Sequence, residues 1–332
     1  MDREQFIRAS VTTRVYEKNL LTSNNIQRLV DSSNLSEAIS LLNDSSYGEF
    51  MKDINRNEEY EKALLSMLKE SYKKIRKISP DKNLIVFLEE KYNFHNLKVL
   101  VKELIQDADY STAYMDIGTI DLSAIKKAIK SDFKTFDDVY ITYAQNALDL
   151  YEDTKDPQDI DLSLDRNFYQ KLLIDAKNLA FDSLVDFTRQ RIDLVNLKSL
   201  LRIKGQNQSI DLLKKALIDG GFINKNNFIL GFNQDMGLLA NFFINEKTYP
   251  LVKKALDSKD LKEATRMIEK AIDDYLLDFA KDSKKVSYGP EVMLGYLINR
   301  EMEIKNLRII LVAKQNMLSR EFIEERLRNL YV

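Results

Sequence analysis

The chain has 332 residues, a formal net charge of −2 and 31% charged residues, so its surface is solvated and of mixed sign. A nucleic-acid-binding protein normally carries a basic excess or a basic face, and this balance argues against that class. The absence of cysteine excludes disulfides and thiolate chemistry, and a single histidine argues against a zinc site. No apolar run approaches the roughly 20 residues of a membrane span, and the charged N-terminus lacks the apolar stretch of a signal peptide.

Helix-forming residues dominate the composition. Only nine glycines and four prolines interrupt the chain, while Lys, Glu, Leu and Ala are plentiful. No stretch shows the sustained apolar–polar alternation of a half-buried strand. We therefore predict an all-α fold with a substantial core, and a cytoplasmic location fits the absence of cysteine.

Helix-start patterns recur along the chain. Residues 31–38 offer Ser or Asn as an N-cap, residues 257–264 echo this pattern, and residues 135–139 do so more faintly. A longer amphipathic helix is predicted in each third of the chain, over residues 61–74, 165–180 and 269–281. Each unit then reads as a short-helix region, a long helix, a turn and a second long helix.

That second helix carries a segment that occurs three times, at residues 94–100, 194–200 and 304–310. Each copy reads apolar-x-Asn-Leu-basic-x-apolar, with Asn96, Asn196 and Asn306 about a hundred residues apart. In the first and third copies a proline–acid pair lies upstream, Pro80-Asp81 and Pro290-Glu291. Proline suits the first turn of a helix and an acid favours the positive end of its dipole, so we predict that the helix starts near this pair.

The repeat predicts three similar helical domains, over residues 1–118, 119–215 and 216–332. Two long antiparallel helices alone expose an apolar face, so the units must pack on one another. They stack in a line, as in a solenoid, or close around a pseudo-threefold axis, and periodicity does not separate these arrangements. The lack of an evident capping repeat favours closure.

The repeated polar residues have two interpretations. An Asn amid apolar helix positions usually bonds a carbonyl or hydroxyl at a helix crossing, because leaving it unpaired costs roughly 1–3 kcal/mol. Alternatively, the Asn and the basic residue that follows it recur on a surface that meets a partner. The basic residues are Lys98, Lys198 and Arg308, and solvation or neutralisation of the helix C-terminus explains them equally well.

The sequence offers no catalytic constellation, and we predict no catalytic, metal-binding or cofactor-binding residues. His95 would have to serve any Ser-His-Asp arrangement, yet the repeat places Val195 and Lys305 at the same position, so we expect an ordinary helix residue. Residues 149–165 are acidic but lack calcium-loop spacing, and Pro157 predicts a loop there. We interpret this stretch as a solvated connector, with a docking surface for a basic partner as the alternative. No phosphate-binding glycine loop occurs.

Both ends of the chain resemble one protein family. The matching blocks are residues 14–21, 41–42, 46–48, 288–297, 300–311, 314 and 324–328. Together with the threefold repeat between them, these blocks are similar to the C subunit of V/A-type rotary ATPases, whose eukaryotic counterpart is the d subunit. The block from Gly289 to Arg308 is fairly specific, whereas the middle third of the chain is generic helix.

The resemblance implies a funnel-shaped, all-helical body of three similar domains about a pseudo-threefold axis. It implies a non-catalytic central-stalk subunit, monomeric within its complex and peripheral to the cytoplasmic face of the membrane. Such a subunit links the central-shaft subunits to the membrane rotor ring and transmits torque for ion transport. No nucleic acid and no direct membrane span are expected.

Four charged residues of the most specific block are candidates for contact with a partner: Glu291, Glu301, Glu303 and Arg308. Their alternative role is intramolecular, as an acid at the helix start and as charge pairs at helical spacing. The rival function is a helical-repeat scaffold that binds soluble proteins through a concave surface. An enzyme that uses carboxylates and a divalent metal is a third class, and metal-dependent stabilisation would be its signature.

Overall fold

The computed structural model describes residues 2–131, 138–233, 236–244 and 248–329, and every regular element in these ranges is a helix. The predicted all-α fold is confirmed. The first α-helices are α1 Ile7–Glu17, α2 Ser23–Asp31, α3 Leu35–Asn43, α4 Gly48–Met51, α5 Tyr60–Ile78, α6 Asn83–Gln106, α7 Leu122–Lys130 and α8 Val139–Thr154. The others are α9 Pro157–Asn178, α10 Asp182–Gly205, α11 Ile210–Ala216, α12 Lys225–Asn233, α13 Tyr249–Leu256, α14 Leu261–Asp282, α15 Pro290–Gln315 and α16 Arg320–Arg326.

Short 3₁₀ helices join several of these elements, at Glu4–Phe6, Asn57–Glu59, Ser111–Ala113, Met236–Phe243 and Ser283–Lys285. None of the helices in the described part of the chain has the length and apolar character that a membrane crossing requires.

Side-chain caps explain where several helices begin. Asn34 caps α3 by accepting a hydrogen bond from the Glu37 N–H at 3.0 Å, so the helix starts within the predicted segment 31–38. Asp138 caps α8 through the N–H of Tyr140. The start predicted at 135–139 therefore agrees at Asp138, while residues 135–137 lie outside the described ranges.

The acidic stretch 149–165 is almost entirely helical, so its interpretation as a connector is wrong. Asp156 caps α9 through the N–H of Gln158 at 2.9 Å, and Pro157 follows as the first helical residue. Only Lys155 and Asp156 separate α8 from α9. The predicted loop is therefore two residues long, and α9 begins well before the predicted start at residue 165.

The repeated helices α6 and α15 start differently from each other. Pro290 is the first residue of α15, as predicted. In the first copy α6 begins at Asn83, close to the predicted Pro80-Asp81 pair, and the Asn83 N–H donates to the Asp81 carboxylate at 2.9 Å. The Asp81 side chain serves as the cap, so Pro80 is left outside the helix.

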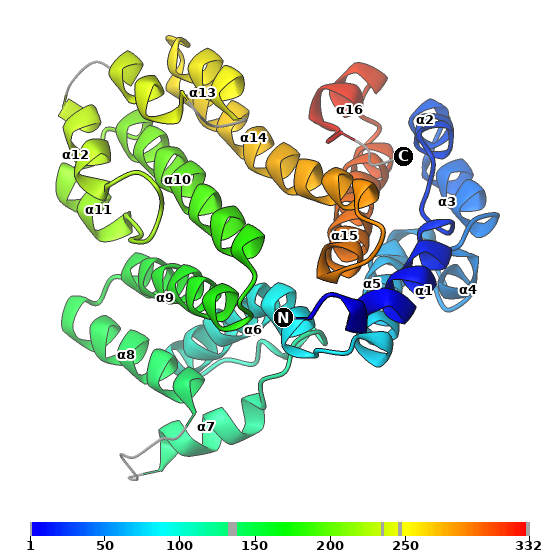
Figure 1. Ribbon diagram of the computed structural model, residues 1–332, viewed down its shortest axis with the longest axis horizontal. Coiled ribbons are helices and arrows are strands. Elements are labelled where there is room, and N and C mark those ends of the chain that lie inside the picture. The colour runs from blue at the N-terminus through cyan, green and yellow to red at the C-terminus, as the bar shows by residue number, and fades with distance from the viewer. Residues whose placement is uncertain (1, 132–137, 234–235, 245–247, 330–332) are drawn as a thin grey trace. The chain divides into compact units, whose positions relative to one another are not determined.

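The described chain forms two compact units. The first runs from Val86 to Ile272, and in it α8, α9 and α10 lie side by side (Figure 1). Aromatic rings fill part of its core, where Phe94 of α6 meets Phe168 of α9 edge-on with ring centroids 5.6 Å apart. Leu164 and Leu197 of the same unit are fully buried.

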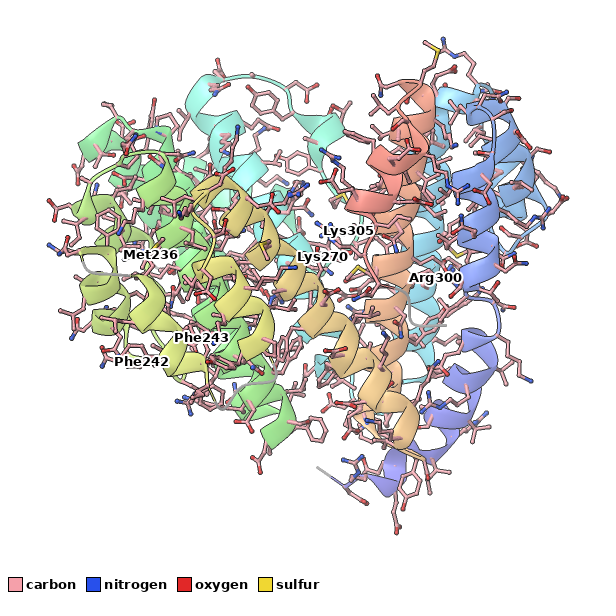
Figure 2. The ribbon with its side chains drawn as sticks, turned by 90° about the horizontal axis from the view of Figure 1, so that it is seen from above. Met236, Phe242, Phe243, Lys270, Arg300 and Lys305 are labelled. Carbon is pink, nitrogen blue, oxygen red and sulfur yellow. The ribbon has the colours of Figure 1, made fainter. Side chains whose placement is uncertain are left out.

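The second unit joins the two ends of the chain, Asp2–Ile85 with the residues from Asp273 onward. In it α15 packs against α1 and α5, and Figure 2 marks the course of α15 by Arg300 and Lys305. Both unit boundaries fall inside continuous helices, α6 and α14, and not in linkers. The division into three domains about a pseudo-threefold axis stays a prediction.

A buried carboxyl lies on α6 in the first unit. The Glu90 side chain is fully buried, accepts a hydrogen bond from the Tyr140 hydroxyl at 2.6 Å and lies 3.7 Å from the Lys171 ammonium. Burial raises the pKa of Glu90 above its ordinary value, and the Tyr140 hydrogen bond and Lys171 oppose this shift only in part. Lys171 has a second, closer carboxylate in Asp175 at 2.6 Å.

We expect Glu90→Gln to be more stable relative to the wild type at pH 7 than at pH 4. Because its pKa is raised on folding, Glu90 binds a proton in the folded chain over a range in which the unfolded chain has lost it. Stability is then lost as the pH rises from the ordinary glutamate pKa through the raised value. Thermal unfolding of both proteins across this range should show the variant gaining stability relative to the wild type as the pH rises. A stability difference between the two proteins that does not change with pH would contradict this prediction.

Candidate functional site

Each repeated asparagine pairs with both backbone groups of one loop residue. This residue lies beyond the short helix that follows the repeated helix, which is Ser111–Ala113 in the first copy, α11 in the second and α16 in the third. The side-chain NH2 donates to that residue's carbonyl, and the side-chain oxygen accepts from its N–H. The pairs are Asn96 with Met115 at 2.8 and 2.8 Å, Asn196 with Ile218 at 2.9 and 2.9 Å, and Asn306 with Arg328 at 3.1 and 2.9 Å. We call this arrangement the asparagine clamp.

The clamp satisfies buried groups that would otherwise be costly. All three asparagines are buried, and Asn306 is completely inaccessible. A primary amide presents a donor and an acceptor with the spacing of a backbone residue's own N–H and C=O, so the two hydrogen bonds form together. The loop beyond each of these short helices is thereby fastened to the preceding repeated helix.

A second polar residue, three positions before each asparagine, extends the clamp in two of the copies. Asn93 accepts from the Thr119 N–H at 2.8 Å, and Asp193 accepts from the Phe222 N–H at 2.8 Å. Glycines let these loops come close. A Cβ at Gly118 would lie 2.4 Å from the Asn93 oxygen, and one at Gly221 would lie 2.0 Å from the Asp193 oxygen.

In the third copy the equivalent residue, Glu303, holds the N-terminal part of the chain. Its carboxylate accepts from the Leu21 N–H at 2.5 Å and from the Tyr47 hydroxyl at 2.6 Å, and it pairs with Arg300. Arg300 is only 1% exposed. Burial and the Glu303 charge hold the pKa of Tyr47 well above its ordinary value, so the hydroxyl remains a donor.

The basic residue of each repeat pairs with an acid on one of the long helices. The pairs are Lys98 with Asp165 of α9 at 2.6 Å, Lys198 with Glu269 of α14 at 4.0 Å, and Arg308 with Glu61 of α5 at 2.5 Å. All six side chains are partly exposed, so each pair contributes at most about 1 kcal/mol. The three acids are the first residues of the long helices predicted from the sequence.

The remaining predicted residues also have partners within the second unit. Glu291 forms two hydrogen bonds of 2.9 Å with the Arg3 guanidinium, and Glu301 accepts from the Tyr72 hydroxyl. The structure therefore brings Glu303 together with Arg300 but separates Glu291, Glu301 and Arg308 into different local contacts. Contact of any of these residues with another protein stays a prediction.

The single histidine contacts a backbone carbonyl. The Nε2 atom of His95 lies 2.9 Å from the Ala113 carbonyl oxygen, within the loop that the first clamp holds. Within the described ranges, no group of three or more His, Asp or Glu side chains is placed to hold a metal ion. Asp159, Asp161 and Asp165 of the acidic stretch pair with Lys215, Lys102 and Lys98.

Comparison with known proteins decides the family. Residues 9–326 match the model of the ATP synthase (C/AC39) subunit family. The chain belongs to this family. It is 27% identical over 287 residues to the C subunit of the V-type sodium ATPase of Enterococcus hirae, an alignment that spans 86% of this chain and 85% of that protein. It is 24% identical over 351 residues to the C subunit of the A-type ATP synthase of Methanocaldococcus jannaschii, an alignment that spans 98% of this chain and 87% of that protein.

A third relative, the C subunit of the A-type ATP synthase of Desulfurococcus, is 26% identical over 325 residues, spanning 94% of this chain and 87% of that protein. The resemblance of the two chain ends to the C subunits of these enzymes is thus confirmed over nearly the whole length. The protein is a subunit of a V/A-type rotary ATPase.

We expect Asn196→Ala to lower the free energy of unfolding by about 2–4 kcal/mol, because it leaves the buried N–H and C=O of Ile218 without partners. Urea unfolding measures the loss. Lys198→Ala, two residues along the same helix, serves as the control and should cost less than about 1 kcal/mol. Equal losses for the two variants would show that the clamp is not the stronger of the two interactions.

We expect Glu303→Gln to destabilise the protein by about 3 kcal/mol, because the buried Arg300 charge loses its counter-charge. The matched control is Glu301→Gln on the same helix, where the carboxylate accepts from the Tyr72 hydroxyl and Gln retains an acceptor. Thermal and urea unfolding of both variants test this ranking. A Glu303→Gln protein as stable as the control would refute it.

Proposed function

We propose that this protein is the non-catalytic C subunit of the central stalk, which links the rotating shaft of a V/A-type ATPase or ATP synthase to its membrane rotor ring. The observation that carries the proposal is the family match over residues 9–326. The relatives are C subunits of such enzymes, and this chain aligns with 85% or more of the length of each. In this role the protein transmits torque for ion transport and catalyses nothing itself.

The order of the ion pairs supports closure of three domains about a pseudo-threefold axis. With the predicted boundaries, Lys98 of the first domain pairs with Asp165 of the second, and Lys198 of the second pairs with Glu269 of the third. Arg308 of the third domain pairs with Glu61 of the first. In a linear stack of repeats, the basic residue of the last repeat and the acid of the first would lie too far apart to form an ion pair.

A torque-transmitting protein needs a stiff body, because bending would store the work that it should pass on. The asparagine clamps tie each loop to its helix, and Glu303 with Arg300 ties the N-terminal segment to α15. These internal bonds favour rigidity. We place the protein at the cytoplasmic face of the membrane, peripheral to it, with one face on the rotor ring and the other on the central-shaft subunits.

The proposal predicts two stable complexes. The purified chain, mixed with central-shaft subunits or with detergent-solubilised rotor ring, should elute with one copy per shaft and one copy per ring. Size-exclusion chromatography with light scattering gives these masses directly. A chain that stays monomeric with both would exclude the coupling role and would favour a scaffold for soluble proteins.

A further inference from the structure

Three helix junctions in the chain are built in the same way. In each, a repeated helix meets a long helix through the basic residue of the repeat: α6 with α9, α10 with α14, and α15 with α5. The junction of α6 with α9 has a second ion pair one turn further along, Lys102 with Asp161 at 2.9 Å. The equivalent positions in the other two junctions differ.

The positions equivalent to Lys102 and Asp161 are Arg202 and Thr265 in the second junction, and Val312 and Asn57 in the third. The third junction has therefore lost both charges. The second junction has the cation but lacks the acid. Within the described part of the chain, Arg202 has no carboxylate within ion-pair distance, and its neighbour Lys198 reaches Glu269 only at 4.0 Å.

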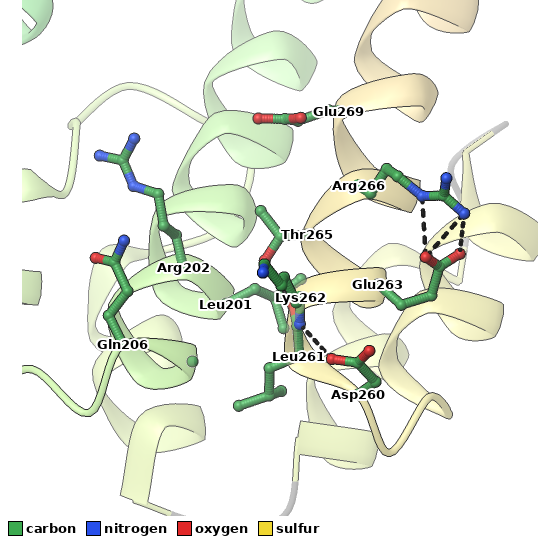
Figure 3. A pocket seen from close by; sticks show the side chains of 11 residues that line it. Leu201, Arg202, Gln206, Asp260, Leu261, Lys262, Glu263, Thr265, Arg266 and Glu269 are labelled. Atoms are coloured by element: carbon green, nitrogen blue, oxygen red, sulfur yellow. Dashed lines mark hydrogen bonds and ion pairs between the residues drawn. The ribbon is translucent and has the colours of Figure 1, made fainter. Parts of the chain in front are cut away.

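An open cleft of about 760 Å³ lies where this ion pair is missing. Figure 3 shows its two walls, with Arg202 on α10 and Gln206 just after it, and with Lys262, Thr265 and Glu269 on α14. The floor is apolar, formed in part by Leu201 and Leu261. Gly205 keeps the helices close at one end, because a Cβ there would lie 3.2 Å from the Leu261 Cβ.

The acids of the cleft are already engaged. Glu263 forms hydrogen bonds of 2.9 and 3.0 Å with Arg266, and Asp260 accepts from the Lys262 N–H at 2.9 Å. Glu269 faces Lys198. The Arg202 guanidinium and the Lys262 ammonium are thus the groups that the described chain leaves open to a ligand.

We propose that this cleft docks an acidic segment of a partner protein, whose Glu or Asp side chain pairs with Arg202 as Asp161 pairs with Lys102. The cleft is wide enough for several side chains, and the exposed Arg202, Lys262 and Arg266 leave it open to solvent. Small-molecule sites enclose most of their ligand, so a segment carried by a macromolecule fits this opening better. The inference goes beyond the proposed function, since it concerns the chemistry of one cleft and not the identity of the complex.

Fluorescence anisotropy of a labelled helical peptide with glutamates at every fourth position tests the proposal on the full chain. The wild type should bind this peptide and not its Glu→Gln counterpart. Arg202→Gln should weaken binding about tenfold, which is the loss expected for one charge-assisted hydrogen-bonded pair. Lys254→Gln, which removes one exposed cation of α13, is the matched control and should bind as the wild type does.

Thr265→Asp adds a test that does not depend on loss of folding. The new carboxylate would stand opposite Arg202 as Asp161 stands opposite Lys102, so this variant should have a higher melting temperature and should no longer bind the peptide. Equal binding by the wild type, Arg202→Gln and Thr265→Asp would overturn the proposal, as would no binding to the wild type. Free glutamate that competes as well as the peptide would mark a site for small carboxylates and would also overturn it.

Discussion

The fold depends on one interaction that is used three times, a buried asparagine that pairs with both backbone groups of a loop residue beyond the next short helix. A chain leaving a long helix must satisfy its backbone N–H and C=O groups wherever it turns away from solvent. The asparagine amide does this from inside the preceding helix, so the position of the loop is determined by a residue some twenty positions earlier.

The third copy shows how the same device holds the ends of the chain. Asn306 holds the backbone of Arg328 near the C-terminus, while Glu303 holds the backbone of Leu21 near the N-terminus. One helix, α15, therefore anchors both ends of the chain in the second unit. The proposed torque-transmitting role requires termini that are fixed to the core, because a frayed end would yield under load.

The sequence predicted the repeated helices and the asparagines, because both follow from local spacing. It did not reveal the partners of the asparagines. The segment from Asn96 to Met115 and the segment from Asn196 to Ile218 differ in length, so the repeat spacing does not point to the partner. Gly118 and Gly221 were the available signal, as each permits a close approach to the polar residue of the clamp. The start of α6 lies close to the predicted proline–acid pair, but there the aspartate caps the helix and the proline stays outside it.

The charge pairs needed the fold before they could be assigned. Many acids lie on the long helices, and only the packing of α6, α10 and α15 selects which of them meets the basic residue of each repeat. The same holds for the cleft between α10 and α14. Thr265 does not stand out in the sequence, and its significance follows only from its position at the place of Asp161.

Native-state hydrogen exchange at three amides tests whether the asparagine clamps hold their loops in place. Met115, Ile218 and Arg328 lie in loops, where amides ordinarily exchange quickly, yet each donates to a clamp asparagine. If the clamps hold, all three amides exchange slowly, and Asn196→Ala removes the protection at Ile218 alone. Exchange at these amides as fast as at their loop neighbours would contradict it.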